Sequence, residues 1–398
     1  MKKEKVLIVH NYYKISGGED SVVENEKEML ELNGHSVIIY SRNNNELKKM
    51  NFLKKISVTL NSIFSFRTKK DIKKIVKEKN IDIVHVHNTL PLISPSVYWG
   101  AKSGGAKVVQ TIHNFRLICP SATLTNKNRI CEKCIEKNLI SAIKGKCYRN
   151  SYIQTIVSVC ILKFNRIIGT YNKVDRYIAL TDFNKKKLEC YLDSEKIAIK
   201  PNFVSNQFNE LGNKENKENK ENKYFIYVGR IDKLKGIEVL LRAWKDIKNE
   251  KLILIGDGPE LNNSINFIKE NNIDNVEFLG RKDKNEIKKY LKSAKMIVVP
   301  SLWYEGFPMT IIEAFSQGVP VIASNIGNLK NIINDNVNGI LFNLNDYKDL
   351  AIKINKLHKS PDLLKKYSIN AYNDFINKYN SKVNYKELKN IYEEIMES

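Results

Sequence analysis

Short runs of aliphatic and β-branched residues alternate with longer amphipathic stretches along the chain, and this pattern occurs twice. It is the pattern of βαβ units, because parallel strands covered by helices on both faces need apolar residues throughout. The sequence therefore predicts two α/β domains with parallel sheets. The predicted strands are Val6–Val9, Val37–Tyr40, Ile81–Val86, Lys107–Ile112, Arg176–Leu180 and Lys196–Ile199, then Tyr224–Val228, Leu252–Ile255, Val276–Leu279, Met296–Val299, Pro320–Ala323 and Ile340–Phe342.

A polar repeat separates the two sets of strands. Residues 212–223 read GNKENKENKENK and have no apolar side chain to bury, which predicts a solvated linker. The length of 398 residues also exceeds one ordinary core, and two smaller cores imply a cleft between them. We expect an N-terminal domain over 1–205 with a cysteine-rich insertion at about 116–150, a linker over 206–223, a C-terminal domain over 224–373 and an amphipathic helix over 374–398.

The net charge and the apolar segments restrict partners and location. A formal charge of +22 favours nucleotides, polyanions or an acidic membrane face, although Lys and Asn are abundant everywhere, as an AT-rich genome would produce. The run Val6–Val9 is too short for a signal peptide, and Ile153–Ile168 is interrupted by Lys163 and Arg166. We therefore expect a cytoplasmic protein, at most peripheral on the inner face of the membrane.

The strongest candidate site follows the predicted strand Met296–Val299. Ligands of open parallel sheets bind beyond the carboxyl ends of the strands. Here Glu305 in a loop and Glu313 in a helix are eight positions apart, and the helix should begin near Pro308. Its free amides can hold a phosphate or a sugar hydroxyl, and both carboxylates can accept hydrogen bonds from hydroxyls. The alternative is a surface carboxylate and an ordinary carboxylate at a helix start.

Two further loops follow strands of the second set. An arginine fork and a lysine point charge suit a diphosphate leaving group that no metal neutralises; chance placement in a basic chain is the alternative. A Gly-Asp-Gly turn leaves room for a ligand or simply closes the chain. No G-x-G-x-x-G follows the first strand and no P-loop motif is present, which disfavours dehydrogenases and P-loop NTPases. The residues concerned are Gly229, Arg230, Lys235 and Gly236, and Gly256 with Gly258.

In the first half, a glycine pair and a histidine are the candidates. Gly17 and Gly18 follow the first strand, where their amides can approach a phosphate or an acceptor; a flexible turn is the alternative. His113 ends the strand Lys107–Ile112 and can hydrogen-bond a sugar. Of the remaining strand histidines, His10, His85 and His87, we expect two to be structural.

Together these motifs resemble the family 4 retaining glycosyltransferases of the GT-B fold, in which two Rossmann-like domains face a central cleft. The resemblance covers nearly the whole chain and implies transfer of a hexosyl group from a UDP- or GDP-linked sugar by front-face substitution. It also implies that catalysis needs no divalent cation and that the terminal helix packs back on the N-terminal domain. The roles that it implies are diphosphate binding for Arg230 and Lys235, ribose binding for Glu313, orientation of the donor sugar for Glu305, Gly306 and Phe307, and contact with the sugar and acceptor for His113.

The cysteine-rich insertion departs from that pattern. Cys119, Cys131, Cys134 and Cys147 lie within it, including one C-x-x-C. In a cytoplasmic chain this spacing favours a structural zinc site over disulfides, and a polar insertion gains stability from a metal. Unpaired thiols and redox chemistry are the alternatives. Similar segments among surface-polysaccharide members of the family support a structural role.

Residues 144–173 combine basic and aliphatic side chains in one helical stretch. Such a helix can lie on an anionic membrane near a lipid-linked acceptor; a core-packed helix with solvated lysines is the alternative. The basic residues are Lys144, Lys146, Arg149, Lys163, Arg166 and Lys173, and the apolar ones are Ile153, Ile156, Val157, Ile161, Leu162 and Phe164.

The most specific expectation is therefore an enzyme that builds cell-surface polysaccharide such as capsule, O-antigen or a teichoic-type glycan. One alternative is a basic nucleic-acid-binding or scaffold protein with a zinc module, but the chain lacks the aromatic and basic interleaving of RNA-recognition modules. Nucleic acid is thus not an expected partner. Another alternative is a different GT-B enzyme, such as a sugar-nucleotide epimerase or a phosphorylase.

Overall fold

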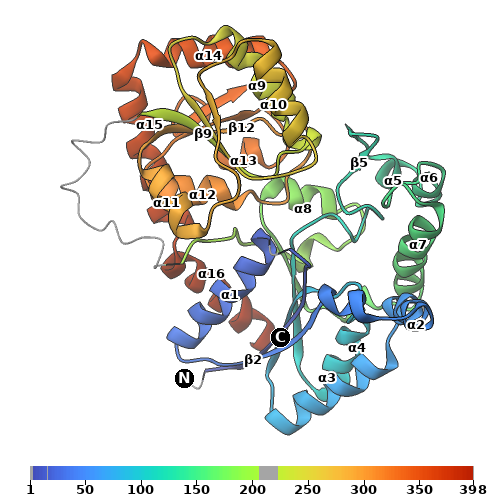
Figure 1. Ribbon diagram of the computed structural model, residues 1–398. Coiled ribbons are helices and arrows are strands. Elements are labelled where there is room, and N and C mark those ends of the chain that lie inside the picture. The colour runs from blue at the N-terminus through green and yellow to red at the C-terminus, as the bar shows by residue number, and fades with distance from the viewer. Residues whose placement is uncertain (1–2, 16, 206–222, 398) are drawn as a thin grey trace. The chain divides into compact units, whose positions relative to one another are not determined.

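The computed structural model describes residues 3–15, 17–205 and 223–397, so Ser16 and nearly all of the expected linker lie outside the described residues. The chain forms two compact units. Each unit has a six-stranded parallel sheet with helices packed against it (Figure 1). The predicted fold class of two α/β domains with parallel sheets is confirmed. Unit 1 comprises Met1–Lys127, Cys131–Asn202 and Lys382–Ser398, and unit 2 comprises Asn128–Ile130 and Phe203–Ser381.

The sheet of unit 1 has the strand order β2-β1-β3-β4-β7-β8. Its central strands are buried on both faces, as β3 shows with no exposed position, so the near-continuous apolar runs predicted them correctly. The strands are β1 (Lys5–Tyr12), β2 (Ser36–Asn43), β3 (Ile83–Asn88), β4 (Lys107–Ile112), β7 (Arg176–Ala179) and β8 (Ile197–Ile199). The longer helices are α1 (Gly18–Leu32), α2 (Phe52–Ile63), α3 (Phe66–Lys79), α4 (Ser96–Gly104), α7 (Tyr152–Ile167) and α8 (Asp182–Leu188).

The sheet of unit 2 has the strand order β11-β10-β9-β12-β13-β14, and each strand predicted in the second half overlaps one of its strands. Trp244 of α9 is fully buried in its core and donates its indole N–H to the Glu250 carbonyl oxygen. The strands are β9 (Tyr224–Val228), β10 (Leu252–Ile255), β11 (Val276–Phe278), β12 (Ala294–Val299), β13 (Val321–Ser324) and β14 (Gly339–Phe342). The helices are α9 (Ile237–Asp246), α10 (Leu261–Glu270), α11 (Lys284–Lys292), α12 (Met309–Ser316), α13 (Leu329–Ile332), α14 (Tyr347–His358) and α15 (Pro361–Asp374).

The last helix, α16 (Ser381–Glu397), belongs to unit 1 apart from its first residue. Its Tyr392 is buried, and the phenol lies 2.7 Å from Nδ1 of His85. The boundary falls later than the expected position 374, because Phe375 and Tyr379 are still buried within unit 2. The tail therefore leaves unit 2 only at Ser381.

The expected insertion contains structure that the sequence did not predict. It holds a small hairpin of β5 (Thr125–Asn126) and β6 (Arg129–Ile130), followed by α5 (Lys133–Glu136) and α6 (Ile140–Lys144). The α6 segment packs on α7 through a small apolar cluster that includes Leu139 and Leu162. In the described part of the chain, no helix combines the length and the apolar character needed to cross a membrane.

Candidate active site

Three loops at the carboxyl ends of adjacent strands β10, β9 and β12 lie against one another in unit 2. A Cβ at Gly256, where φ is +146°, would lie 1.8 Å from the carbonyl oxygen of Gly229. A Cβ at Gly236, where φ is +74°, would lie 1.8 Å from the carbonyl oxygen of Pro300. A Cβ at Gly258 would lie 2.2 Å from the carbonyl oxygen of Ile231. Only glycine allows these approaches, so the glycines let the three loops close on each other.

Lys235 and Glu305 meet where these loops converge. The ammonium group lies 2.9 Å from each oxygen of the carboxylate. Glu305 is only 5% exposed, and its Oε1 also accepts hydrogen bonds from the Ser301 hydroxyl at 2.5 Å and the Trp303 indole at 2.9 Å. The carboxylate is therefore buried with both its charge and its orientation fixed.

The backbone of the Glu305 loop is also held in place. The amide of Asn328 donates to the carbonyl oxygens of Glu305 and Gly306. Phe307 is buried against Tyr379, with ring centroids 6.1 Å apart in an edge-on arrangement. Helix α12 begins directly after this loop, at Met309. Its first amides thus face the same end of the sheet as the Lys235–Glu305 pair.

Arg230 and Glu313 belong to the same loops and helix but lie outside this pair. Arg230 is two-thirds exposed, at 67%, and its Nε lies 3.3 Å from Asp232. Glu313 is partly buried on α12, and burial raises the pKa of its carboxyl against the opposing effect of Lys284. Within the described residues, no hydrogen bond or ion pair joins either side chain to Lys235 or Glu305.

The glycine pair of unit 1 lies at the start of α1. Gly17 is the N-cap, with φ of −129°, and a Cβ there would meet nothing within 4 Å, so the space beside it is open. Its amide donates to the carboxylate of Asp20 at 3.2 Å, and that carboxylate lies 2.8 Å from Nε2 of His10. Gly18 is the first helical residue. His10 is thus tied to the glycine turn through Asp20.

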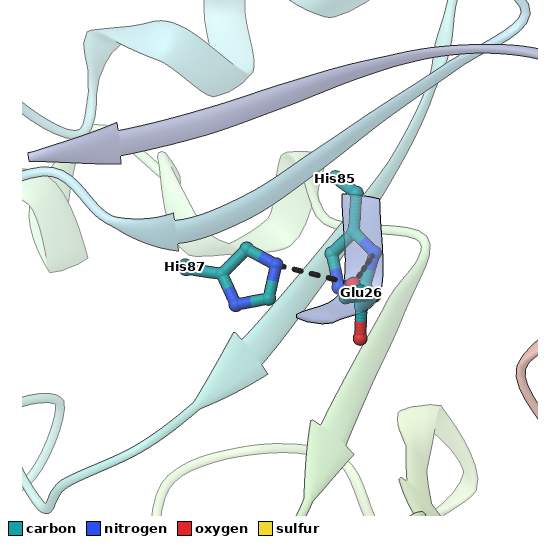
Figure 2. A group of neighbouring side chains, drawn as sticks. All are labelled: Glu26, His85 and His87. Carbon is teal, nitrogen blue, oxygen red and sulfur yellow. Dashed lines mark hydrogen bonds and ion pairs between the residues drawn. The ribbon is translucent and has the colours of Figure 1, made fainter. Parts of the chain in front are cut away.

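His113 ends a row of polar side chains in unit 1, and it is itself only partly buried. Its Nε2 lies 2.9 Å from Nδ1 of His87, and the two rings are stacked with centroids 5.2 Å apart. Nε2 of His87 lies 3.2 Å from Oε1 of Glu26 on α1. Figure 2 shows His85 and His87 both directed at this carboxylate. His87 and His113, together with Arg116, line a pocket that is open to solvent.

Burial decides the protonation of this row. It lowers the pKa of His87 to about 4 and that of His113 well below its ordinary value, so both rings are neutral near pH 7. Burial alone would raise the pKa of Glu26, but His85, Lys200 and His87 outweigh it and hold that pKa well below its usual range. Glu26 is therefore an ionised, fully buried carboxylate.

The histidine row predicts that unit 1 loses stability in mild acid. His87 titrates near 6.5 in the unfolded chain but near 4 in the folded one, so the unfolded state binds more protons between these values. The free energy of unfolding should thus fall as the pH drops from about 6.5 to 4, by about 3 kcal/mol from His87 alone. Thermal unfolding should show a smaller acid loss for His87→Phe than for the wild type; equal losses would contradict this.

The four cysteines of the insertion gather in one place but are not disulfide-bonded. Burial, reinforced by the three other thiols, raises the pKa of Cys134 to about 12, and burial also raises the pKa of Cys147. Among the described residues, the one group of potential metal ligands with all ligand atoms within 4.8 Å of one another is Glu26, His85 and His87. The thiols are therefore clustered less tightly than that group.

Several contributing residues were missed from the sequence. Ser301 and Trp303 precede Glu305 in its own loop, so donors beside a carboxylate were an available signal. Glu26 had no such signal, because its partner Lys200 lies 174 positions away along the chain. His87 was noted on its strand, but its link to His113 depends on how β3 and β4 align.

Comparisons with known proteins cover both units. Residues 15–208 match the family described as Glycosyltransferase Family 4, and residues 209–374 match Glycosyl transferases group 1. An uncharacterized glycosyltransferase of Methanocaldococcus jannaschii is 28% identical over 98% of each chain. The UDP-Gal:alpha-D-GlcNAc-diphosphoundecaprenol alpha-1,3-galactosyltransferase of Escherichia coli is 28% identical over 80% of this chain and 77% of its own. A crystal structure of a glycosyltransferase from Rickettsia africae superposes with a TM-score of 0.70 at 22% identity, covering 100% of this chain and 99% of the other.

Proposed function

Since the chain belongs to glycosyltransferase family 4 and adopts the GT-B fold, we propose that it transfers a hexosyl group from a nucleotide-diphosphate sugar with retention of configuration. The donor is UDP- or GDP-linked, and the acceptor is a glycan or lipid-linked intermediate of cell-surface polysaccharide. The ion pair between Lys235 and the buried Glu305, at the strand ends of unit 2, carries this proposal. The Escherichia coli relative, named for a UDP-sugar donor and a diphosphoundecaprenol acceptor, supports both substrate classes.

The pair supplies the two functions that front-face transfer needs. Lys235 is 30% exposed, so its ammonium can neutralise the departing diphosphate while Ser301 and Trp303 keep Glu305 in position. Glu305 accepts hydrogen bonds from the donor sugar, and Glu313 accepts them from the ribose. The acceptor hydroxyl attacks the face that the diphosphate leaves, and a phosphate oxygen takes the proton, so no nucleophilic side chain and no metal is required.

A thermal-shift screen with UDP- and GDP-linked sugars tests donor use. A cognate donor binds only the folded protein, so it should raise Tm by several degrees, as mass action requires, without added divalent cation. Single-stranded nucleic acid serves as the control for attraction by charge alone. Stabilisation by nucleic acid and by none of the sugar nucleotides would support the nucleic-acid-binding alternative and contradict this proposal.

A membrane-facing surface on unit 1 would bring the enzyme to a lipid-linked acceptor. Helices α2 and α7 pack together, with Phe64 and Phe164 ring centroids 6.2 Å apart (Figure 1). Neither residues 47–70 nor residues 137–174 contain Asp or Glu, so every charged side chain of these two segments is basic. Ile161 and Leu162, which we expected on the membrane side, are instead buried. The apolar side chains exposed on the two helices include Leu53, Ile56, Leu60, Ile153, Ile156, Phe164 and Ile167.

We expect the protein to bind vesicles that contain anionic lipid, and to lose that binding at high salt. Ile153 is 76% exposed on α7, so Ile153→Glu should weaken binding at least severalfold in a flotation assay without affecting folding. Ile352→Glu is the matched control, since Ile352 is 67% exposed on α14 of unit 2. No binding at low salt, or equal loss in both variants, would contradict a surface on α2 and α7.

We also propose that the four insertion cysteines hold a structural zinc ion. The clustered thiols fit a soft, four-coordinate metal, which would draw them together and release their protons. Metal analysis of reduced protein should find about one zinc per chain. The double variant Cys131→Ser/Cys134→Ser should lose it, whereas Cys160→Ser, at an exposed cysteine outside the cluster, should keep it. Protein without stoichiometric zinc would rule out this role.

A further inference from the structure

We propose that Glu26 and His87 are positioning residues that fix the tautomer of His113, so that His113 offers an unprotonated Nδ1 to a substrate hydroxyl. The inference rests on the proposed function for the nature of the ligand, a sugar or acceptor hydroxyl. The tautomer itself follows from the contacts within unit 1. It can therefore be tested without any substrate.

The carboxyl group of Glu26 is ionised because a buried ammonium group lies beside it. Its side chain is fully buried, and Lys200, which is 1% exposed, places its ammonium 3.3 Å from Oε2. Lys200 also donates to Oδ1 of Asn384 at 2.9 Å, which holds the ammonium at this position. A carboxylate beside a buried cation is ionised and can only accept hydrogen bonds. Both imidazoles at its other oxygen must then be donors.

The proton that His87 donates to Glu26 fixes the positions of the remaining protons on His87 and His113. His87 donates its Nε2–H to Oε1 of Glu26, at 3.2 Å. In a neutral imidazole the other nitrogen carries a lone pair, so Nδ1 of His87 accepts the Nε2–H of His113, at 2.9 Å. Nδ1 of His113 is then unprotonated as well. Within the described residues no hydrogen bond to this atom is found, and the ring lines the pocket beside Asn114 and Arg116.

His85 completes the surroundings of Glu26. Its Nδ1 lies 2.9 Å from Oε1 of Glu26 and 2.7 Å from the Tyr392 hydroxyl, and its Nε2 lies 2.8 Å from the hydroxyl of Thr111. These partners leave Glu26 with hydrogen bonds on both oxygens. They hold the carboxylate in one orientation, which keeps His87 in a single tautomer.

A metal ion is the competing explanation for Glu26, His85 and His87, because their ligand atoms lie within 4.8 Å of one another (Figure 2). The buried ammonium of Lys200 opposes it, since a divalent cation would add to a positive charge already paired with the same carboxylate. In addition, both nitrogens of the His87 ring already have hydrogen-bond partners, Glu26 at Nε2 and His113 at Nδ1. The hydrogen-bonded row therefore explains all the contacts, and a metal explains only three residues.

The row restricts what His113 can do. A neutral imidazole held by Nε2 accepts a hydrogen bond from a hydroxyl through Nδ1 but donates none to the substrate. Its depressed pKa makes it a weak proton acceptor, so it orients a hydroxyl and leaves proton removal to the departing phosphate. A substrate that lacks this hydroxyl should lose the hydrogen bond to Nδ1 of His113.

Nitrogen NMR of protein labelled at its six histidines tests the tautomer directly. Substituting the histidines one at a time assigns the signals. At pH 7 we expect both His87 and His113 to be neutral with the proton on Nε2. A proton on Nδ1 of His113, a tautomer mixture or an imidazolium in the wild-type protein would overturn the inference, and so would a change of these signals on removal of metal ions.

The variant His87→Phe keeps a ring but removes the acceptor for His113. We expect the His113 signals to change to a tautomer mixture, with KM for the acceptor or donor raised about tenfold and kcat less affected. His358→Phe, in unit 2, is the control and should change neither. An unchanged KM with a scrambled tautomer would overturn the substrate contact. If His87→Phe does not fold, the wild-type spectra still decide the tautomer, and the expected tautomer without any sugar transfer would count against the proposed function alone.

Discussion

Lys235→Ala should lower kcat/KM for sugar transfer by about 100- to 1000-fold, the usual effect of removing one charge-stabilising group from a transition state. Lys235 is a point charge held by Glu305 at the convergence of three loops, and its ammonium lies at the strand ends where a diphosphate would bind. Without it, negative charge that develops on the leaving group has one neutralising group fewer. Steady-state kinetics with a cognate donor measure the loss.

Lys233→Ala is the matched control for this variant. Lys233 lies on the same short helix, Lys233–Lys235, but its ammonium is 3.8 Å from Glu260 and its side chain is 59% exposed. We expect it to keep kcat/KM within about twofold, because exposed ion pairs contribute little. Equal losses in the two variants would show a general effect of charge, and near-normal turnover in Lys235→Ala would remove Lys235 from the site.

Glu305→Ala should have the second large effect, on both activity and stability. The carboxylate is 5% exposed and satisfies Lys235, Ser301 and Trp303, so its removal leaves these donors without their common acceptor. We expect kcat/KM to fall by about 100-fold or more and the free energy of unfolding to fall by about 1–3 kcal/mol. Urea denaturation and steady-state kinetics measure the two quantities.

Glu305→Gln separates charge from shape. The amide oxygen can still accept from Ser301 and Trp303, so stability should stay within about 1 kcal/mol of the wild type. The charge that holds Lys235 is lost, and kcat/KM should therefore fall by about tenfold or more. A fully active Glu305→Gln enzyme would show that Glu305 acts only as a structural acceptor.

The strands were predictable because their environment is simple. A buried parallel strand such as β10 (Leu252–Ile255) needs apolar side chains on both faces, and this requirement is visible in four consecutive residues. The hairpin of β5 and β6 was missed because two-residue strands have no periodicity. The start of the tail helix was placed too early because Phe375 and Tyr379 have helical spacing but pack within unit 2.

That Lys235 and Glu305 lie close together could be predicted, although different loops contain them. Glu305 and Lys235 each follow a strand, and the topology of a parallel sheet brings such loops to one edge. The row from Glu26 to His113 was not predictable, because its residues come from α1, β3 and the end of β4. Its partner Lys200 also lies far away along the chain. A sequence shows which residues can be charged, but the fold decides which of them share a proton or a hydrogen bond.

The most direct test of the account is the anomeric configuration of the product, followed by proton NMR during a single reaction. With an α-linked sugar nucleotide, an acceptor and no added divalent cation, we predict an α-linked product and release of the nucleoside diphosphate. A β-linked product would contradict front-face transfer at the Lys235–Glu305 site. Conversion of the donor into a second sugar nucleotide or a free sugar, with no new glycosidic bond, would instead assign the chain a different reaction.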